Sequence, residues 1–212
     1  MNQRQMNDLR ITRRLLLVAA AAAALTVAVP HYAQAARLTP PDVPFKLRVP
    51  EGNRLFLLGS AIGTQNYVCL PTATGGFAWS LFTPEATLFN DDHRQLITHF
   101  FSPNPDRDDF GAIRATWQDS RDTSAVWAKV APDGMSTDSN FVEDGAIPWL
   151  LLERVGKQFG PDGDDTLAVT TFVQRVHTHG GNADATQCLQ TTDAGKRAFV
   201  PYTADYYFYT KQ

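Results

Sequence analysis

Hydrophobic and polar residues alternate with a period of two along most of the chain from residue 45 onward. This alternation predicts β-strands with one buried face, and turn residues separate the alternating stretches at intervals of roughly 8 to 12 residues. The longest stretch, residues 166–178, is rich in Val and Thr, which favour strands. The strands predicted in this way span residues 45–49, 54–59, 65–70, 77–82, 86–89, 95–101, 112–118, 124–130, 147–154, 166–178 and 199–211.

The predicted fold class is all-β, and the predicted architecture is an antiparallel β-sandwich or flattened barrel of about ten strands. Only residues 147–154 leave a choice between a strand and a short helix. In the last predicted strand, Tyr207 and Tyr209 point away from the side taken by Tyr206 and Phe208. One of these two pairs must therefore leave the core, unless both faces of the sheet are covered.

The first 35 residues have the three parts of a cleavable signal peptide. Four arginines stand in the first 14 residues, an uncharged apolar run of 15 residues follows at 15–29, and Ala33-Gln34-Ala35 gives an A-x-A end. At about 1.5 Å of rise per residue, the apolar run is too short for a bilayer core of roughly 30 Å. We expect cleavage between Ala35 and Ala36, which leaves residues 36–212 as a single all-β domain.

The same segment indicates where the mature protein is found. Arg13 and Arg14 precede three leucines, a pattern that fits twin-arginine export as well as the general secretion route. Either route delivers an exported protein, periplasmic or extracellular, with no membrane span in its mature part. No cysteine follows the apolar run, so a lipid anchor at the new N-terminus is not expected.

The net charge of residues 36–212 limits the kinds of molecule that the protein is expected to bind. Removal of residues 1–35 takes four Arg and one Asp from the chain's 19 basic and 22 acidic residues, which leaves 15 and 21 and a net charge of −6. No basic run remains in residues 36–212. Nucleic acid and anionic membrane surfaces are therefore poor partners on electrostatic grounds.

Cys69 and Cys188 are the two cysteines of the chain. An even number of cysteines in an exported protein predicts pairing, and two cysteines permit one bridge. The alternative is a pair of buried free thiols. A bridge between positions so far apart in sequence would be structural, because no C-x-x-C motif of a disulfide-exchange enzyme is present.

The most specific candidate for a functional site is a metal site at His177 and His179. Residues two apart on an extended strand point to the same side, so both imidazoles could bind one metal ion, with His99 from another strand as a third ligand. Zinc or copper would suit such a set. The alternative without a functional role is that these histidines are ordinary exposed residues at the end of a strand, beside Gly180 and Gly181.

Other routes to catalysis have little support in the sequence. The acidic turns around residues 106–109 and 162–165 lack the spacing of an EF-hand, so solvated turn charge is the preferred interpretation over calcium. Neither a G-x-S-x-G elbow nor an H-E-x-x-H helix occurs. We therefore predict no catalytic residue and no cofactor, and a metal-dependent enzyme built on the histidines remains the alternative.

The chain is rich in bulky aromatic residues for its length. Most are expected in the core, but exposed Trp and Tyr would stack on sugar rings. These residues are Trp79, Trp117, Trp127, Trp149, Tyr202, Tyr206, Tyr207 and Tyr209. The leading hypothesis is a non-catalytic binding or envelope-associated protein, with a cell-wall or extracellular glycan as the ligand.

Several segments together resemble one known family. They are Val49-Pro50-x-Gly52, Gly63-x-Gln65-x-Tyr67-x-Cys69, Trp79 with Pro84-x-Ala86-x-Leu88, His99-Phe100, Ile147-Pro148-Trp149-Leu150, Gln174-Arg175-Val176-x-Thr178-x-Gly180-Gly181, Cys188 and Val200-Pro201-Tyr202-Thr203-Ala204-Asp205-Tyr206-Tyr207-Phe208-Tyr209. On these residues the chain resembles the domain-of-unknown-function 3455 family of secreted proteins. The resemblance implies export and the two cysteines, but no activity. Some relatives carry a dehydrogenase label, yet this chain has no strand followed by G-x-G-x-x-G.

Overall fold

A computed structural model of the chain describes residues 38–212. The predicted signal peptide and its cleavage point between Ala35 and Ala36 lie outside the described residues. Within residues 38–212, no helix is long and apolar enough to cross a membrane. The strands are β1 (Asn53–Pro71), β2 (Phe77–Phe89), β3 (Gln95–Pro103), β4 (Ile113–Asp119), β5 (Ala125–Ser136), β6 (Trp149–Gln158), β7 (Thr170–Gly180) and β8 (Arg197–Lys211), and the 3-10 helices are η1 (Phe45–Leu47), η2 (Arg107–Asp109), η3 (Ala185–Gln187) and η4 (Thr191–Asp193).

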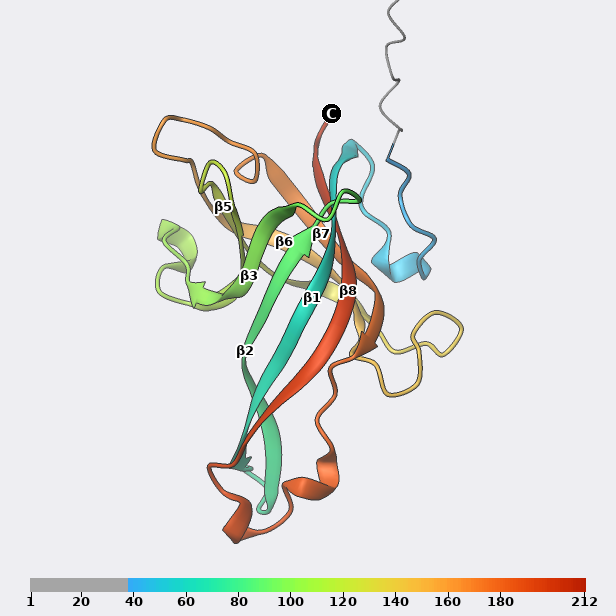
Figure 1. Ribbon diagram of the computed structural model, residues 1–212, viewed down its shortest axis with the longest axis vertical. Helices are drawn as coiled ribbons and strands as arrows, with labels where there is room; N and C mark the ends of the chain where they lie inside the picture. The colour runs from blue at the N-terminus through green and yellow to red at the C-terminus, as the bar shows by residue number, and fades with distance from the viewer. Residues whose placement is uncertain (1–37) are drawn as a thin grey trace, which may run out of the picture. The chain divides into compact units, whose positions relative to one another are not determined.

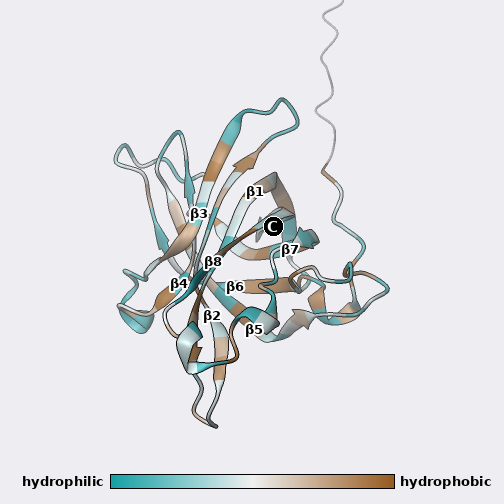
Figure 2. Cartoon of the chain, turned by 60° about the horizontal axis from the view of Figure 1, so that its bottom comes forward, coloured by the Kyte–Doolittle hydropathy of each residue, from teal (hydrophilic) through white to brown (hydrophobic). Residues whose placement is uncertain are grey.

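The eight strands form one closed antiparallel barrel, in which each strand pairs with its neighbours in sequence. Pairing of β1 with β8, from Asn53–Lys211 to Val68–Arg197, closes the barrel. Figure 1 shows β1, β2 and β8 side by side as long strands that reach well beyond the others. Pairing with β3 covers only the end of β2, from Ala86 to Phe89, so the rest of that edge of β2 lies outside the closed part of the barrel. Figure 2 shows hydrophobic residues along the strands and mainly hydrophilic loops between them.

The all-β prediction is confirmed, but the barrel has eight strands where about ten were predicted. Residues 54–59 and 65–70 both belong to β1, and residues 77–82 and 86–89 both belong to β2. The stretch between the first two stays extended because it pairs with β2 on one side and β8 on the other. Residues 45–49, predicted as a strand, contain η1 instead, whereas residues 147–154 do form a strand.

Both sides of the barrel wall are covered. An inner cluster packs inside the barrel and includes Tyr206 and Phe208. A second cluster lies outside the wall and includes Tyr207 and Tyr209, together with Leu47 of η1 and residues of the β5–β6 connection. From Tyr206 to Thr210 the last strand therefore buries both of its faces, which resolves the choice that alternation alone left open.

The N-terminal segment is attached to the outside of the wall by one polar side chain. Gln174 of β7 points outward, and its Nε2 donates to the carbonyl oxygen of Leu47 over 2.7 Å. The hydroxyl of Tyr209 donates to Oε1 of the same amide over 2.5 Å. Both the nitrogen and the oxygen of the Gln174 amide thus have partners. Leu47, the last residue of η1, is completely buried against the wall.

The predicted disulfide is confirmed. Cys69 near the end of β1 is bonded to Cys188 in the connection between η3 and η4, with the two Cα atoms 5.6 Å apart. Backbone hydrogen bonds join Cys69 to Lys196 and Gly195 in the segment that leads into β8. The bridge therefore fixes the long β7–β8 connection to the far end of β1.

Candidate functional site

A cavity of about 380 Å³ opens from the interior of the barrel to solvent. Each of the eight strands contributes to its lining, which identifies the cavity as part of the barrel lumen. One residue per strand, in chain order, is Gln65, Pro84, His99, Ala115, Ala128, Leu152, Arg175 and Tyr206. Eight-stranded barrels are just wide enough to be filled by side chains or to hold one small ligand. Here the side chains leave space for a ligand.

Two aromatic rings form part of the cavity wall. His99 on β3 and Trp117 on β4 are directly paired across the two strands. Their rings are stacked, with centroids 4.4 Å apart and planes 6° from parallel. Tyr206 of β8 packs against both rings, at centroid distances of 5.2 Å from His99 and 5.7 Å from Trp117. These contacts hold the wall rigid because each ring is in contact with the other two.

His99 is a neutral ring. Burial lowers its pKa to about 3, and the positive charge of Arg175 acts in the same direction, against a smaller opposite effect of a hydrogen bond to Thr116. Its Nδ1 lies 2.8 Å from the carbonyl oxygen of Thr116. Because a carbonyl can only accept, Nδ1 carries the proton, and Nε2 is left as an acceptor.

Two buried nitrogen donors of the lining lack hydrogen-bond partners among residues 38–212. They are the side-chain amide Nε2 of Gln65 and the indole Nε1 of Trp117. A buried donor without a partner costs about 1 to 3 kcal/mol, so such groups are rare in folded proteins. Both nitrogens are shielded from the open space of the cavity, so an acceptor on a bound molecule would reach them only if neighbouring side chains move aside.

The exposed part of the cavity lining is mainly apolar, with Lys129 and Asn182 as its polar members. Leu81, Ile113, Val130 and Met135 belong to it, and all four are exposed, from 37% for Leu81 to 57% for Ile113. Large apolar side chains gathered around one opening indicate a surface that an apolar molecule covers. The cavity therefore combines polar groups in its wall with a mainly apolar entrance.

The structure places the three candidate metal ligands on different sides of the wall. His99 lies inside the barrel, whereas His177 contacts Trp149 and Tyr207 of the outer cluster. Nδ1 of His177 pairs with Asp205 over 2.9 Å, and His179 pairs with Glu143. His177 has a positive φ of 50° within a β-bulge of β7, so the alternation assumed for residues 177 and 179 is interrupted here.

In residues 38–212 no group of three or more His, Cys, Asp or Glu side chains is placed to hold a metal ion. His177, Asp205 and Ser60 are linked, since the Ser60 hydroxyl donates to the same carboxylate over 2.8 Å. The carboxylate stands between the hydroxyl and the imidazole. The imidazole therefore cannot take the hydroxyl proton as it would in a catalytic triad.

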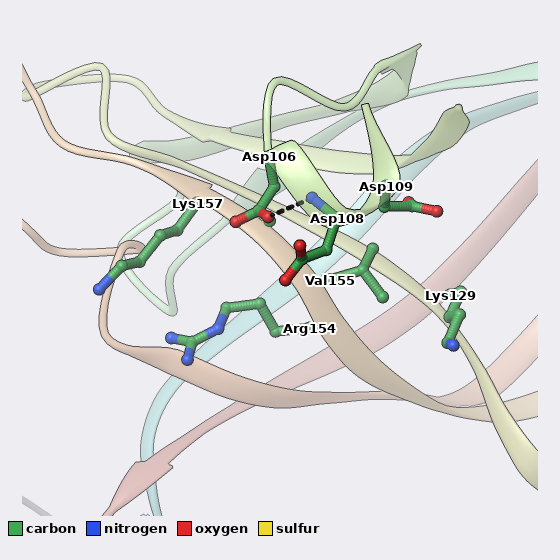
Figure 3. Close-up of a pocket in the computed structure, with 8 residues that line it drawn as sticks. Asp106, Asp108, Asp109, Lys129, Arg154, Val155 and Lys157 are labelled. Atoms are coloured by element: carbon green, nitrogen blue, oxygen red, sulfur yellow. Dashed lines mark hydrogen bonds between the residues drawn. The ribbon is translucent and has the colours of Figure 1, made fainter. Parts of the chain in front are cut away.

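The acidic turn after β3 borders a second, polar hollow of about 420 Å³ (Figure 3). Asp106 accepts a hydrogen bond from the backbone nitrogen of Asp108, and Asp109 forms a 2.7 Å ion pair with Arg114. Hydrogen bonds from Arg114 and Asn104 hold the pKa of Asp109 well below its usual range. The carboxylates of Asp106 and Asp109 thus bind groups of the turn itself and of the following strand β4.

The aromatic residues form core rather than a surface platform. Seven of the eight candidates are buried, namely Trp117, Trp127, Trp149, Tyr202, Tyr206, Tyr207 and Tyr209. Trp79 is half-buried, and its indole nitrogen donates to the carbonyl oxygen of Asp184. The stacking surface that favoured a glycan ligand is therefore largely inside the molecule.

Sequence reasoning named His99 but missed the other polar residues of the cavity, above all Gln65 and Arg175. Both lie in segments with strong β pattern, where a polar side chain at an inward position is unusual. That irregularity was the available signal.

The family model described as "Protein of unknown function (DUF3455)" matches residues 50–210. Neither the curated proteins nor the solved structures contain a match to the chain.

Proposed function

We propose that this chain, which belongs to the DUF3455 family of proteins of unknown function, is an exported, non-catalytic binding protein that takes up one small, partly apolar molecule in its barrel. The observation that carries the proposal is the open cavity of about 380 Å³ to which every strand contributes. At about 30 Å³ per water molecule, the space equals roughly a dozen waters, so the ligand is small.

Two features of the lining support binding. The exposed apolar rim favours contact with an apolar molecule over contact with water. The side-chain nitrogens of Gln65 and Trp117 are buried donors without a partner among residues 38–212, and a ligand acceptor would satisfy them once the side chains that shield them move aside. Apolar lining with a few convergent polar groups is the usual composition of small-molecule sites in proteins.

Export is supported by the sequence and by the disulfide. Residues 1–35 have the composition of a signal peptide, and disulfides persist in oxidising compartments outside the cytoplasm. A protein with this pairing and this N-terminus would meet its ligand in the periplasm or the extracellular medium.

The test is uptake of a neutral apolar fluorophore, N-phenyl-1-naphthylamine, by purified residues 36–212. Its emission should rise and saturate on binding. Ala115→Trp, which places a large side chain in the cavity wall, should abolish the rise. Ala73→Trp, in an exposed turn between β1 and β2, is the matched control and should leave it unchanged.

Circular dichroism of both variants should match that of the parent protein, which shows that loss of uptake is not loss of fold. If the parent protein takes up no fluorophore, or if Ala115→Trp binds it as well as the parent does, the cavity is not the binding site and the proposal is wrong.

A further inference from the structure

Arg175 is a charged residue on the inner side of the barrel wall. On β7, Val173 belongs to the inner cluster, whereas Gln174 and Val176 face the outer cluster. Alternation along the strand therefore turns Arg175 inward, and it lines the cavity. A guanidinium at this position must be stabilised, because charges taken out of water are costly unless they are paired.

The protein itself provides only part of that stabilisation. Nε and Nη2 of Arg175 both donate to the carbonyl oxygen of Pro148, over 3.3 and 2.8 Å. A guanidinium carries five N–H groups, and the hydroxyl of Tyr206 is also in hydrogen-bond contact with it, so part of the remaining three is left for other acceptors. Among residues 38–212, Arg175 has no ion pair.

The two other cations of the lining differ from Arg175 in this respect. Arg114 is paired with Asp109 over 2.7 Å, and Lys129 is paired with Glu153 over 3.2 Å. The part of the chain that the structure describes contributes no Asp or Glu to the cavity lining. Arg175 is thus the one lining cation of this part of the chain whose charge no carboxylate balances.

The neighbours of Arg175 cannot supply a negative charge either. Burial raises the pKa of Tyr67 and of Tyr206, and the charge of Arg175 only partly opposes this, so both phenols are protonated at neutral pH. His99 is a neutral ring with no charge to offer. The lining consequently has a net positive charge, and among residues 38–212 its cations Arg114 and Lys129 are paired with carboxylates whereas Arg175 is not.

We propose that Arg175 binds the carboxylate of a small amphipathic acid, whose apolar or aromatic body fills the cavity toward the apolar rim. The inference rests on the proposed binding function and deepens it. A planar guanidinium with free N–H groups matches the geometry of a carboxylate. The amide of Gln65 and the indole N–H of Trp117 are the two further donors of the wall, and Nε2 of His99 is an acceptor for a ligand hydroxyl.

The test compares 2-naphthoate with 2-naphthamide, which have the same shape and differ in charge. Calorimetry at pH 7 should show that the parent protein binds the naphthoate about ten- to a hundredfold more tightly, as expected for hydrogen bonds to a charged group. Arg175→Met should remove this preference and leave affinity for the naphthamide unchanged, which also shows that the variant folds. Arg175→Lys should retain part of the preference.

Lys157→Met is the matched control, since it removes an exposed positive charge outside the cavity lining. It should keep the full preference for the naphthoate. Equal affinities of the parent protein for the two compounds, or an unchanged preference in Arg175→Met, would overturn the role of Arg175. So would a parent protein that binds neither compound. Uptake of the neutral N-phenyl-1-naphthylamine does not depend on this charge, so the proposed binding function stands or fails separately.

Discussion

His99 and Trp117 form a stacked pair across β3 and β4, with ring centroids 4.4 Å apart inside the barrel. The stack explains how an imidazole is kept in an apolar interior. One face of the ring covers the indole, and Nδ1 donates to the carbonyl oxygen of Thr116. The imidazole accordingly forms part of the cavity wall. Its protonation is unfavourable in the folded protein, because the ring is buried.

Acid should therefore destabilise the protein through His99. Between pH of about 6.5 and 3 the unfolded chain binds a proton at this imidazole while the folded protein does not, so stability falls as pH falls through this window. Carboxyl groups with lowered pKa, such as Asp193 at about 2, begin to lose their contribution as the pH falls below about 5. Comparison with a variant that lacks this imidazole therefore isolates the contribution of His99.

His99→Asn removes the titrating group and keeps a donor near Thr116. Urea unfolding at pH 7 and pH 4 should show that the parent protein loses roughly 2 to 3 kcal/mol more than this variant over the interval, at about 1.4 kcal/mol per pH unit of pKa difference. His93→Asn, in an exposed turn, is the control for removal of an imidazole and should behave as the parent protein does. Equal losses in all three proteins would contradict the assignment.

The Cys69–Cys188 bridge should contribute several kcal/mol to stability. It closes a loop with a sequence separation of 119, and loops of this size correspond to about 4 to 5 kcal/mol if chain entropy in the unfolded state dominates. Denaturant midpoints with and without reductant should differ for the parent protein. The double variant Cys69→Ala, Cys188→Ala should match the reduced parent and show no response to reductant; a response would mean that reductant acts elsewhere.

Attachment of η1 should depend on Leu47. This side chain is fully buried in the outer cluster, whereas Phe45, two residues earlier in the same helix, is 83% exposed. Leu47→Ala should lower the free energy of unfolding by about 2 to 5 kcal/mol. Phe45→Ala should change it by less than about 0.5 kcal/mol in the same urea titration. Comparable losses in both variants would show that η1 is not held as the structure has it.

Close approach of β1 and β2 should make Gly63 intolerant of a side chain. A Cβ atom there would lie 2.5 Å from Cα of Ala86, and backbone cannot give way as a flexible side chain can. We expect Gly63→Ala to destabilise the barrel by about 1 to 3 kcal/mol. Ile62→Ala, at an exposed neighbouring position, should remain within about 0.5 kcal/mol of the parent protein in thermal or urea unfolding.

Much of the fold followed from local pattern. Period-two alternation and turn residues were sufficient to predict the all-β class, and the presence of two cysteines behind a predicted signal peptide was sufficient to predict their bridge. Strand number was overestimated because glycine and proline inside β1 and β2 resemble turn residues in sequence. Those segments stay extended only because strands on both sides pair with them.

The candidate site was harder to predict from the sequence than the fold. His99 was recognised as notable, but its partners were sought in His177 and His179, which share its residue type and not its side of the wall. Its actual neighbours are Trp117, on the next strand along the chain, and Tyr206 of β8, a strand that meets β3 only when the barrel closes. Residue type alone does not reveal such a neighbourhood.

The sequence by itself determined the period-two burial, the pairing of two cysteines and the absence of a recognisable catalytic motif, because these depend on residue type and short spacing. Only the tertiary structure decided that β8 returns to β1, that β8 buries both faces from Tyr206 to Thr210, and that Arg175 points into a cavity without a carboxylate to balance it among residues 38–212. The physical reason is that closure is a long-range event. It brings together side chains whose separation in sequence carries no information about their distance in space.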